Sequence, residues 1–378
     1  MAFRFIHTGD WHFGKPFGRF DDDTGAVLRQ ARGDIVSRVA EAARSRDIRH
    51  VLVAGDVFDA PGLSDDAIRR LLARLRQAGD IVWHLLPGNH DPARDDGIWS
   101  RIAGLGLPDH VRLHLAPETA QLEPGVELLP SPCTSHRGGG DPTAWMDRAP
   151  RTAGAIRIGL AHGSTQGFGG SEPDAGALID PGRRASAGLD YLALGDWHGA
   201  REIAPGVWYA GTPEPEQFQE NDPGYVLAVT IDHAGAIPQV EKVATAQFRW
   251  YRRGFAVGAG GHDTAATVEA ALRALDDEPE RCLVRVELTG DVTAAEDAAL
   301  REVIEDYGSG VRHLRLRTGS LNVHLETAAE AVRDRDVARL AEALAAEALS
   351  ADAATAAAAR TALEKLLQYD RIVPGDAA

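Results

Sequence analysis

The stretch HVLVAGDVFD, residues 50–59, decides how the rest of the chain is interpreted. It is an apolar, strand-like run that ends in Gly55 and Asp56. Four further runs of this kind end in residues that can bind a metal ion, namely FRFIHTGDWH (3–12), IVWHLLPGNHD (81–91), IRIGLAHGS (156–164) and LDYLALGDWH (189–198). In an open α/β sheet, ligands bind in the crevice outside the carboxyl ends of the strands. The five runs therefore predict a metal site at such an edge.

The side chains at the five strand ends form a set without a thiolate. Its members are Asp10, His12, Asp56, Asn89, His90, His162, Asp196 and His198. Carboxylate and amide oxygens suit Mg or Mn, whereas imidazole suits Zn, Fe and Ni. The set therefore favours a catalytic centre over a cysteine-rich structural zinc site. It is larger than one ion needs, which indicates two divalent ions about 3.5–4 Å apart. We expect Mn, with Mg, Fe and Zn as alternatives, and Asp56 as the bridging carboxylate.

The same motifs, in the same order, resemble those of the calcineurin-like metallophosphoesterases. Asp10-Trp11-His12 matches D-x-H, residues 55–59 match G-D-x-x-D, and residues 88–91 match G-N-H-[DE]. His162-Gly163 and residues 195–198 fill the last two motifs. The opening FIHTGDWHFGKPF and the later YAGTPE are similar to the SbcD-type DNA repair nucleases. The resemblance covers roughly the first 230 residues.

The resemblance implies a role for each residue of the site. One ion would take Asp10, His12, Asp56 and His198, and the other would take Asp56, Asn89, His162 and Asp196. His90 would stabilise the phosphate charge and protonate the leaving 3′-oxygen, and Asp59 would orient His90. The last motif departs from the family, because the usual G-H-x-H has Asp196 in place of its first histidine. A carboxylate still ligates, and it favours harder ions such as Mn.

The resemblance also implies the fold, a four-layer phosphoesterase β-sandwich flanked by helices. Residues 1–235 alternate strand and helix, which is typical of sheets covered by helices. Helices are expected at 24–46 and 64–78 from their apolar spacing. Residues 248–325 indicate a small α/β unit, which the resemblance equates with a capping domain.

Residues 327–370 are rich in alanine and predict a C-terminal helical hairpin. Thr327 and Glu330 form a capping box at its start. The resemblance implies that this hairpin docks on the coiled-coil base of an SMC-like ATPase of the SbcC type. Packing on the chain's own domains is the alternative.

The net charge of −16 argues against a nonspecific DNA coat. Proteins that bind phosphates broadly are usually basic on the binding face. Arginines nevertheless cluster locally, and the candidates for DNA contact are Arg183, Arg184, Arg249, Arg252, Arg315 and Arg317. Strand alternation over 311–317 puts Arg315 and Arg317 on one face. That face is either a solvated outer surface or a phosphate-contacting stripe.

Two cysteines in an acidic chain indicate a reducing compartment without a disulfide framework. The first strand begins too close to Met1 for a signal peptide, and no apolar run reaches the roughly 18 residues of a membrane helix. We therefore expect a cytoplasmic protein without membrane contact.

The expected function is Mn-dependent DNA exonuclease or endonuclease activity in repair, carried out together with the SMC-like ATPase. A homodimer is compatible with this function. The alternatives are a small-molecule phosphodiesterase or phosphatase and a weakly catalytic scaffold for the ATPase.

Overall fold

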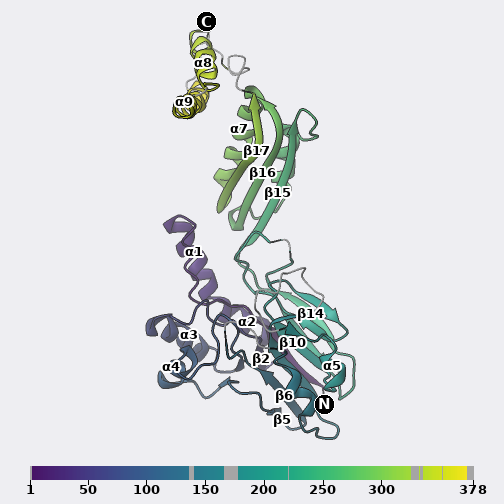
Figure 1. Ribbon diagram of the computed structural model, residues 1–378. Helices are drawn as coiled ribbons and strands as arrows, with labels where there is room; N and C mark the ends of the chain where they lie inside the picture. The colour runs from purple at the N-terminus through teal and green to yellow at the C-terminus, as the bar shows by residue number, and fades with distance from the viewer. Residues whose placement is uncertain are drawn as a thin grey trace. The chain divides into compact units, whose positions relative to one another are not determined.

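The computed structural model describes residues 2–135, 140–165, 178–219, 221–324, 332, 335–350 and 352–372. The chain forms two compact units, Met1–Arg249 and Trp250–Ala378 (Figure 1). Among the described helices, none is both long and apolar enough to cross a membrane.

Two six-stranded sheets form the centre of the first unit. The first has the order β14-β13-β1-β2-β3-β4, with β1 Phe3–Thr8, β2 His50–Val53, β3 Val82–Leu85, β4 Val111–Leu113, β13 Tyr225–Ile231 and β14 Gln239–Ala244. The second has the order β11-β12-β10-β7-β6-β5, with β5 Ala120–Glu123, β6 Val126–Ser131, β7 Ile156–His162, β10 Tyr191–Gly195, β11 Arg201–Ala204 and β12 Val207–Tyr209. A further short pair joins β8 (Ser164–Thr165) to β9 (Leu178–Ile179).

The strands that carry the predicted site are parallel within each sheet. In the first sheet β1 pairs with β2 and β2 with β3, so Val53 lies opposite both Thr8 and Leu85. In the second sheet β7 pairs with β10, with His162 opposite Gly195. The carboxyl ends of the strands are therefore level within each sheet.

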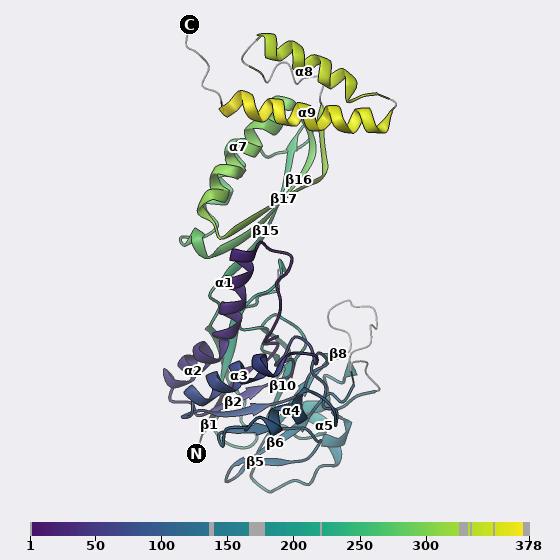
Figure 2. The same ribbon diagram turned by 90° about the vertical axis from the view of Figure 1, so that its left-hand side faces the viewer.

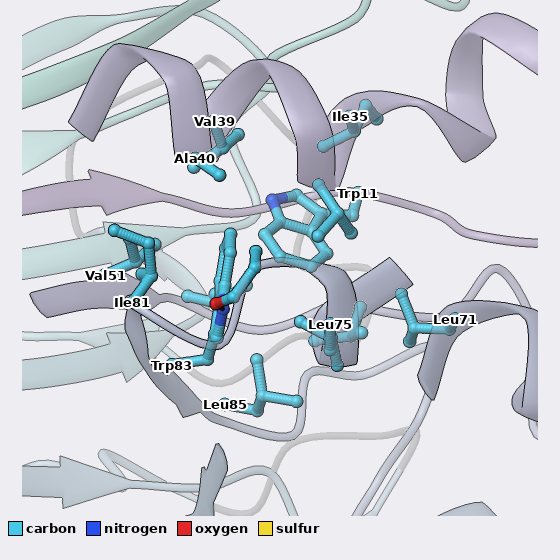
Figure 3. Packing of buried hydrophobic residues seen from close by; sticks show 14 of the residues in the cluster. Trp11, Ile35, Val39, Ala40, Val51, Leu71, Leu75, Ile81, Trp83 and Leu85 are labelled. Atoms are coloured by element: carbon cyan, nitrogen blue, oxygen red, sulfur yellow. Dashed lines mark hydrogen bonds between the residues drawn. The ribbon is translucent and has the colours of Figure 1, made fainter. Parts of the chain in front are cut away.

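Helices cover the outer face of the first sheet (Figures 1 and 2). Helix α1 Asp22–Gly33 projects away from the sheet, and the covering helices are α2 Ile35–Arg44, α3 Asp65–Gln77 and α4 Ile98–Gly104. Their apolar sides meet the sheet around Trp11 and Trp83, whose rings pack edge to face with centroids 5.7 Å apart (Figure 3). Ser64 begins α3 because its hydroxyl accepts a hydrogen bond from the Ala67 amide. These contacts fix the helical layer against β1 and β3.

A second apolar layer lies between the two sheets, and includes Phe5 and Leu52 from one sheet and Ile158 and Tyr191 from the other. The outer face of the second sheet packs on the 3-10 turn η1 (Ala144–Arg148) and on the short helix α5 (Arg183–Ser186). The predicted β-sandwich with helices on both sides is thereby confirmed.

The single helix predicted at 24–46 is wrong, because two helices meet at Asp34. Gly33 and Asp34 are weak helix formers. The Asp34 amide closes α1 by donating to the carbonyls of Ala31 and Gln30, and α2 then begins at Ile35.

The second unit contains the three-stranded sheet β15-β16-β17. Its elements are β15 Arg249–Gly258, α6 Ala265–Arg273, η2 Pro279–Arg281, β16 Cys282–Thr293, α7 Ala294–Gly310, β17 His313–His324, α8 Arg335–Glu347 and α9 Ala353–Ile372. Helices α6 and α7 pack on one face of the sheet through Val268, Leu272, Leu300 and Ile304.

The C-terminal helices α8 and α9 form a small apolar cluster with the start of α7, around Ala294, Ala341 and Leu363. Residues 248–325 and 327–370, predicted as separate parts of the chain, fall within one compact unit from Trp250 onward. The predicted capping box of Thr327 and Glu330 lies outside the described residues. The first unit also extends past residue 235, because β14 completes its first sheet.

Candidate metal centre

The predicted ligands come from five strand ends that belong to two sheets. Those that follow β1, β2 and β3 come from the first sheet, and those that end or follow β7 and β10 come from the second. The strand pattern of the sequence suggested one open sheet, whereas the site lies where the edges of two sheets of a sandwich meet. Both edges meet at His162, whose Nδ1 donates to the Ala54 carbonyl of the other sheet at 2.8 Å.

The backbone is strained where it presents these side chains. Seven described non-glycine residues have positive φ, and four of them are predicted ligands: Asp10 at 52°, His12 at 44°, Asp56 at 50° and Asp196 at 106°. Each such residue costs of order 1–3 kcal/mol and persists only where the surroundings enforce it. The amides of Asp10 and His12 donate to the carbonyls of Gly55 and Asp56, which ties the first two loops together.

Glycines next to the ligands allow the loops to approach closely. A Cβ on Gly88 would lie 2.1 Å from Asp56 Oδ1, and one on Gly55 would lie 2.2 Å from His162 Nδ1. These contacts are too short for any side chain. The glycines of the G-D and G-N-H motifs are therefore required by packing at the site.

Among the described residues, three groups of side chains have ligand atoms close enough to share an ion. They are Asp10, His12 and His198; His12, Asp56 and His90; and Asp10, Asp56 and His162, with the atoms of each group within 4.8 Å of one another. Asp10, Asp56 and His162 are buried. Overlapping groups that share Asp10 and Asp56 suit two neighbouring ions, and their oxygen and nitrogen atoms suit divalent metals.

His162 and Asn89 meet on one side of this cluster. The Nε2 atom of His162 lies 2.9 Å from Asn89 Oδ1 and 3.4 Å from Asp56 Oδ2. Because a carbonyl only accepts hydrogen bonds, the contact of Nδ1 with Ala54 leaves Nε2 turned toward the carboxylates. This is the orientation a metal ligand requires.

His12 and His198 meet on the other side. Their Nε2 atoms lie 3.3 Å apart, and His12 Nε2 is 3.9 Å from Asp56 Oδ2. Two imidazole nitrogens that face each other need a proton or a cation between them. Together with the carboxylate oxygens, they offer a cation a set of mixed donors.

Burial and mutual charge set the ionisation of the cluster. Burial raises the pKa of Asp10 well above its usual range, although His162 opposes the shift. Burial also lowers the pKa of His12 to about 3 and lowers that of His198. Neutral imidazole is the form that binds metal.

Asp56 and His162 shift in opposite directions. Burial acts to raise the pKa of Asp56, but His162 and the other imidazoles outweigh it and leave that pKa below its usual range. Burial acts to lower the pKa of His162, but Asp56 raises it well above the ordinary value. The Asp56 carboxylate is therefore stabilised by the positive charge of His162. A divalent ion can supply that positive charge instead. The residues present thus fit a dimetal site.

His90 lies at the half-buried rim of the cluster. Its amide donates to Asp56 Oδ1 at 2.9 Å, and its Nδ1 donates to the main-chain carbonyl of Asp59 at 2.8 Å. The contact with Asp59 thus involves the carbonyl, whereas the Asp59 carboxylate lies 3.1 Å from Lys15 Nζ and 3.6 Å from His12 Nδ1.

Asp196 is close to the cluster but belongs to none of the three groups. Its Oδ1 lies 3.8 Å from His162 Nε2, and its Oδ2 accepts a hydrogen bond from the Ser164 hydroxyl at 2.7 Å. Its amide donates to Asp10 Oδ1 at 3.0 Å. Ligation by Asp196 stays a prediction, and the serine occupies one of its two oxygens.

Several residues that hold the site were not predicted from the sequence. The buried carboxylate of Asp91 accepts from the amides of Gly88 and Phe58, at 2.6 and 3.0 Å, and so ties the G-N-H loop to the G-D loop. Asp91 could have been found as the last position of the matched motif. Lys15 and Glu216 meet 3.1 Å apart beside His12 and His198, and their separation in sequence gave no signal.

The predicted basic residues have different surroundings. Arg183 is buried and forms ion pairs with Asp141, at 2.8 Å, and with Asp147, so it holds α5 and is removed from the DNA candidates. Arg184 is half-buried and donates to the Asp190 carbonyl.

The other candidates lie on or next to the sheet of the second unit. Arg315 and Arg317 are exposed on β17, and Arg252 is exposed on β15. Arg249 is half-buried at the start of β15. Residues 136–139 and 166–177 lie outside the described residues.

A model of the calcineurin-like phosphoesterase family matches residues 3–172. This chain carries a calcineurin-like metallophosphoesterase domain. That family uses a dimetal site, in agreement with the overlapping ligand groups described above. The predicted resemblance and the predicted phosphoesterase chemistry are confirmed at the level of this family.

Two relatives extend the likeness beyond the metallophosphoesterase domain. The DNA double-strand break repair protein Mre11 of Halobacterium salinarum is 28% identical over 320 residues, covering 81% of this chain and 76% of that protein. The SbcD component of the nuclease SbcCD of Escherichia coli K12 is 26% identical over 282 residues, covering 64% and 68%. Among solved structures, a dimetal phosphatase from Danio rerio covers 64% of this chain and 98% of its own, with 12% identity and a TM-score of 0.38.

Proposed function

We propose that this protein hydrolyses phosphodiester bonds of DNA, as a metal-dependent nuclease in DNA repair. The observation that carries the proposal is the group of buried Asp10, Asp56 and His162 beside the half-buried His90. Such a site suits two ions and leaves a proton donor at its rim. The names of two relatives, a DNA double-strand break repair protein and a nuclease component, support DNA as the substrate.

The ions would be held by the predicted set. One would take Asp10, His12, Asp56 and His198, and the other Asp56, Asn89, His162 and Asp196. When bound, divalent ions at such a site polarise the phosphoryl oxygens and make an attacking water more acidic. We propose Mn, because the oxygen-rich donors favour a harder ion than zinc.

His90 is proposed to protonate the leaving 3′-oxygen. Its Nδ1 donates to the Asp59 carbonyl, so a proton exchanged with substrate would be carried by Nε2. As water forms a new bond to phosphorus, the P–O3′ bond breaks and its oxygen takes the proton from His90. The products are a 5′-phosphate and a 3′-hydroxyl.

The second unit is proposed to contact DNA through the sheet face that carries Arg252, Arg315 and Arg317. Parallel pairing puts Arg315 beside Arg285 and Arg317 beside Glu287. The neighbouring Glu287 lies 2.7 Å from Arg252 and 2.9 Å from Arg285, so it neutralises part of this face. The remaining positive charge suits phosphate contacts of modest strength.

A partner and a location complete the proposal. The Escherichia coli relative is one subunit of a larger nuclease, SbcCD. We propose a coiled-coil ATPase as the partner of this chain and α8 with α9 as its docking segment. The described cysteines, Cys133 and Cys282, are buried thiols, in keeping with the cytoplasm we propose.

An assay with several phosphate esters tests this function. The purified chain with Mn²⁺ is compared on linear duplex DNA, bis-p-nitrophenyl phosphate, p-nitrophenyl phosphate and cyclic nucleotides. We expect cleavage of DNA and of the diester, with little hydrolysis of the monoester. Turnover of cyclic nucleotides or of the monoester alone would favour a small-molecule phosphodiesterase or phosphatase. No turnover by a chain that binds both ions would favour a scaffold.

A further inference from the structure

Two of the proposed ligand imidazoles, those of His12 and His198, each have a carboxylate oxygen near the Nδ1 atom. His12 Nδ1 lies 3.6 Å from Asp59 Oδ1, and His198 Nδ1 lies 3.7 Å from Glu216 Oε1. Their Nε2 atoms face each other at 3.3 Å. The two histidines therefore have matched surroundings, although they come from different sheets.

One lysine joins the two carboxylates. Lys15 Nζ lies 3.1 Å from Asp59 Oδ1 and 3.1 Å from Glu216 Oε1. These are the same oxygen atoms that face the two histidines. The ammonium group thus connects both imidazole–carboxylate pairs.

Glu216 is anchored from behind by a buried arginine. Its side chain is 2% exposed, and its Oε2 lies 3.2 Å from NH2 of Arg32, which is 1% exposed. The other terminal nitrogen of Arg32 donates to the carbonyl of Trp11, between the proposed ligands Asp10 and His12. Glu216 is therefore tied to the loop that carries these ligands.

We propose that Lys15, Asp59 and Glu216 form a bracket that positions His12 and His198 for metal binding. This inference rests on the proposed function, since it takes both histidines as ligands. At 3.6 and 3.7 Å these carboxylates act through charge rather than through hydrogen bonds. A negative charge opposite Nδ1 favours the tautomer with its proton on that nitrogen, which turns the Nε2 lone pair toward the ion. Lys15 keeps the two carboxylates at one separation, and thereby holds the two imidazoles from different sheets facing each other.

A positioning role and a purely electrostatic role for Lys15 predict opposite changes in metal affinity when the lysine is removed. A cation near the site repels divalent ions, so a role through charge alone means that removing Lys15 tightens metal binding. A positioning role means that removing it weakens binding, because both carboxylates lose their fixed place. The sign of the change therefore separates the two explanations.

The test is calorimetric titration of the full-length protein with Mn²⁺ alone. The variants are Lys15→Met, Lys15→Arg and Glu216→Gln, and the control is Lys242→Met, which removes an exposed ion pair with Asp222 far along the chain. We expect Lys15→Met and Glu216→Gln to weaken one of the two binding steps by about 10–100-fold, as loss of outer support for ligand histidines does. The other step should stay within about twofold of the wild type, and Lys15→Arg should restore most of the affinity. The control should bind as the wild type does.

Tighter or unchanged binding in Lys15→Met would overturn the bracket, even in a protein that cleaves DNA. Thermal unfolding of the same samples guards against a general loss of structure. If Glu216→Gln does not fold, Lys15→Met carries the test, since its side chain is 23% exposed. A protein that shows the expected pattern but leaves DNA intact would contradict the proposed substrate and leave the bracket in place.

Discussion

The two compact units use charged residues in opposite ways. In the first unit, Asp10, Asp56 and His162 are buried, and two of the three have strained backbone. In the second unit, Arg315 and Arg317 lie exposed on a regular strand. Buried charges must be placed accurately because their desolvation is costly when unmatched. Exposed charges are solvated and individually worth little. Single substitutions should therefore have large effects in the first unit and small effects in the second.

The largest effect that leaves the metal in place is expected at His90. In His90→Asn, the amide can still donate to the Asp59 carbonyl, but the proposed proton donor is lost. Mn-dependent cleavage of DNA should fall by about 10²–10⁴-fold, the usual contribution of general acid catalysis. Metal content, measured by mass spectrometry, should match the wild type. A variant that loses an ion would show that His90 is a ligand, as its grouping with His12 and Asp56 permits.

Gly88 provides a purely steric test of the same site. In Gly88→Ala the new Cβ would meet Asp56 Oδ1 at 2.1 Å, so the loop must move. We expect a loss of about 1–3 kcal/mol in the free energy of unfolding and weaker Mn²⁺ binding. Gly104→Ala is the matched control, because no atom lies within 4 Å of the added Cβ. Equal stability of the two variants would contradict the close packing described here.

A row of three histidines, of which His50 and His84 are buried and His114 is half-buried, tests the first unit away from the metal centre. His50 Nδ1 lies 3.1 Å from His84 Nε2, and His84 Nδ1 lies 3.0 Å from His114 Nε2. His50 Nε2 lies 3.2 Å from the carboxylate of Glu123. Burial lowers the pKa of His114 to about 4 and lowers the pKa values of His50 and His84 as well.

These shifts give the direction of the pH dependence. The unfolded chain binds more protons below the ordinary pKa of 6.5, so stability is full above that pH and falls as the pH drops toward about 4. His84→Phe should reduce this loss, measured as the difference in melting temperature between pH 7 and pH 5. His233→Phe, at an exposed position, should leave it unchanged. If His84→Phe has the same melting-temperature difference as the wild type, the row does not cause the loss of stability in acid.

The smallest effects are expected on the basic face. Arg315→Ala and Arg317→Ala should each weaken DNA binding by a few-fold and reduce the slope of log affinity against log salt by about 1. Melting temperature should not change, because both side chains are exposed. Arg339→Ala, an exposed arginine on α8, serves as the control. Unchanged affinity and salt slope in both variants would show that Arg315 and Arg317 do not contact DNA.

The sequence could predict the residues of the buried cluster but not the residues that support them. Asp10, Asp56 and His162 follow apolar runs, and that local pattern is readable because strands end where loops begin. Lys15 and Glu216 approach each other only through the fold, so no spacing in the sequence reports them. Arg183 is the opposite case. Its place in a pair of arginines predicted a DNA contact, whereas the fold buries it in an ion pair with Asp141. The packing of two sheets into a sandwich could be predicted only from the resemblance to a known family, because local periodicity does not tell which strands share a sheet.

Titration of the wild type and Asp56→Asn with Mn²⁺ tests the two-metal centre most directly. Asp56 lies in two of the three ligand groups, and its Oδ2 is 3.4 Å from His162 Nε2 and 3.9 Å from His12 Nε2. The wild type should bind two ions per chain, and Asp56→Asn should lose both together while it keeps its circular dichroism spectrum. A single ion in the wild type, or two ions retained in Asp56→Asn, would contradict a bridged pair of metals.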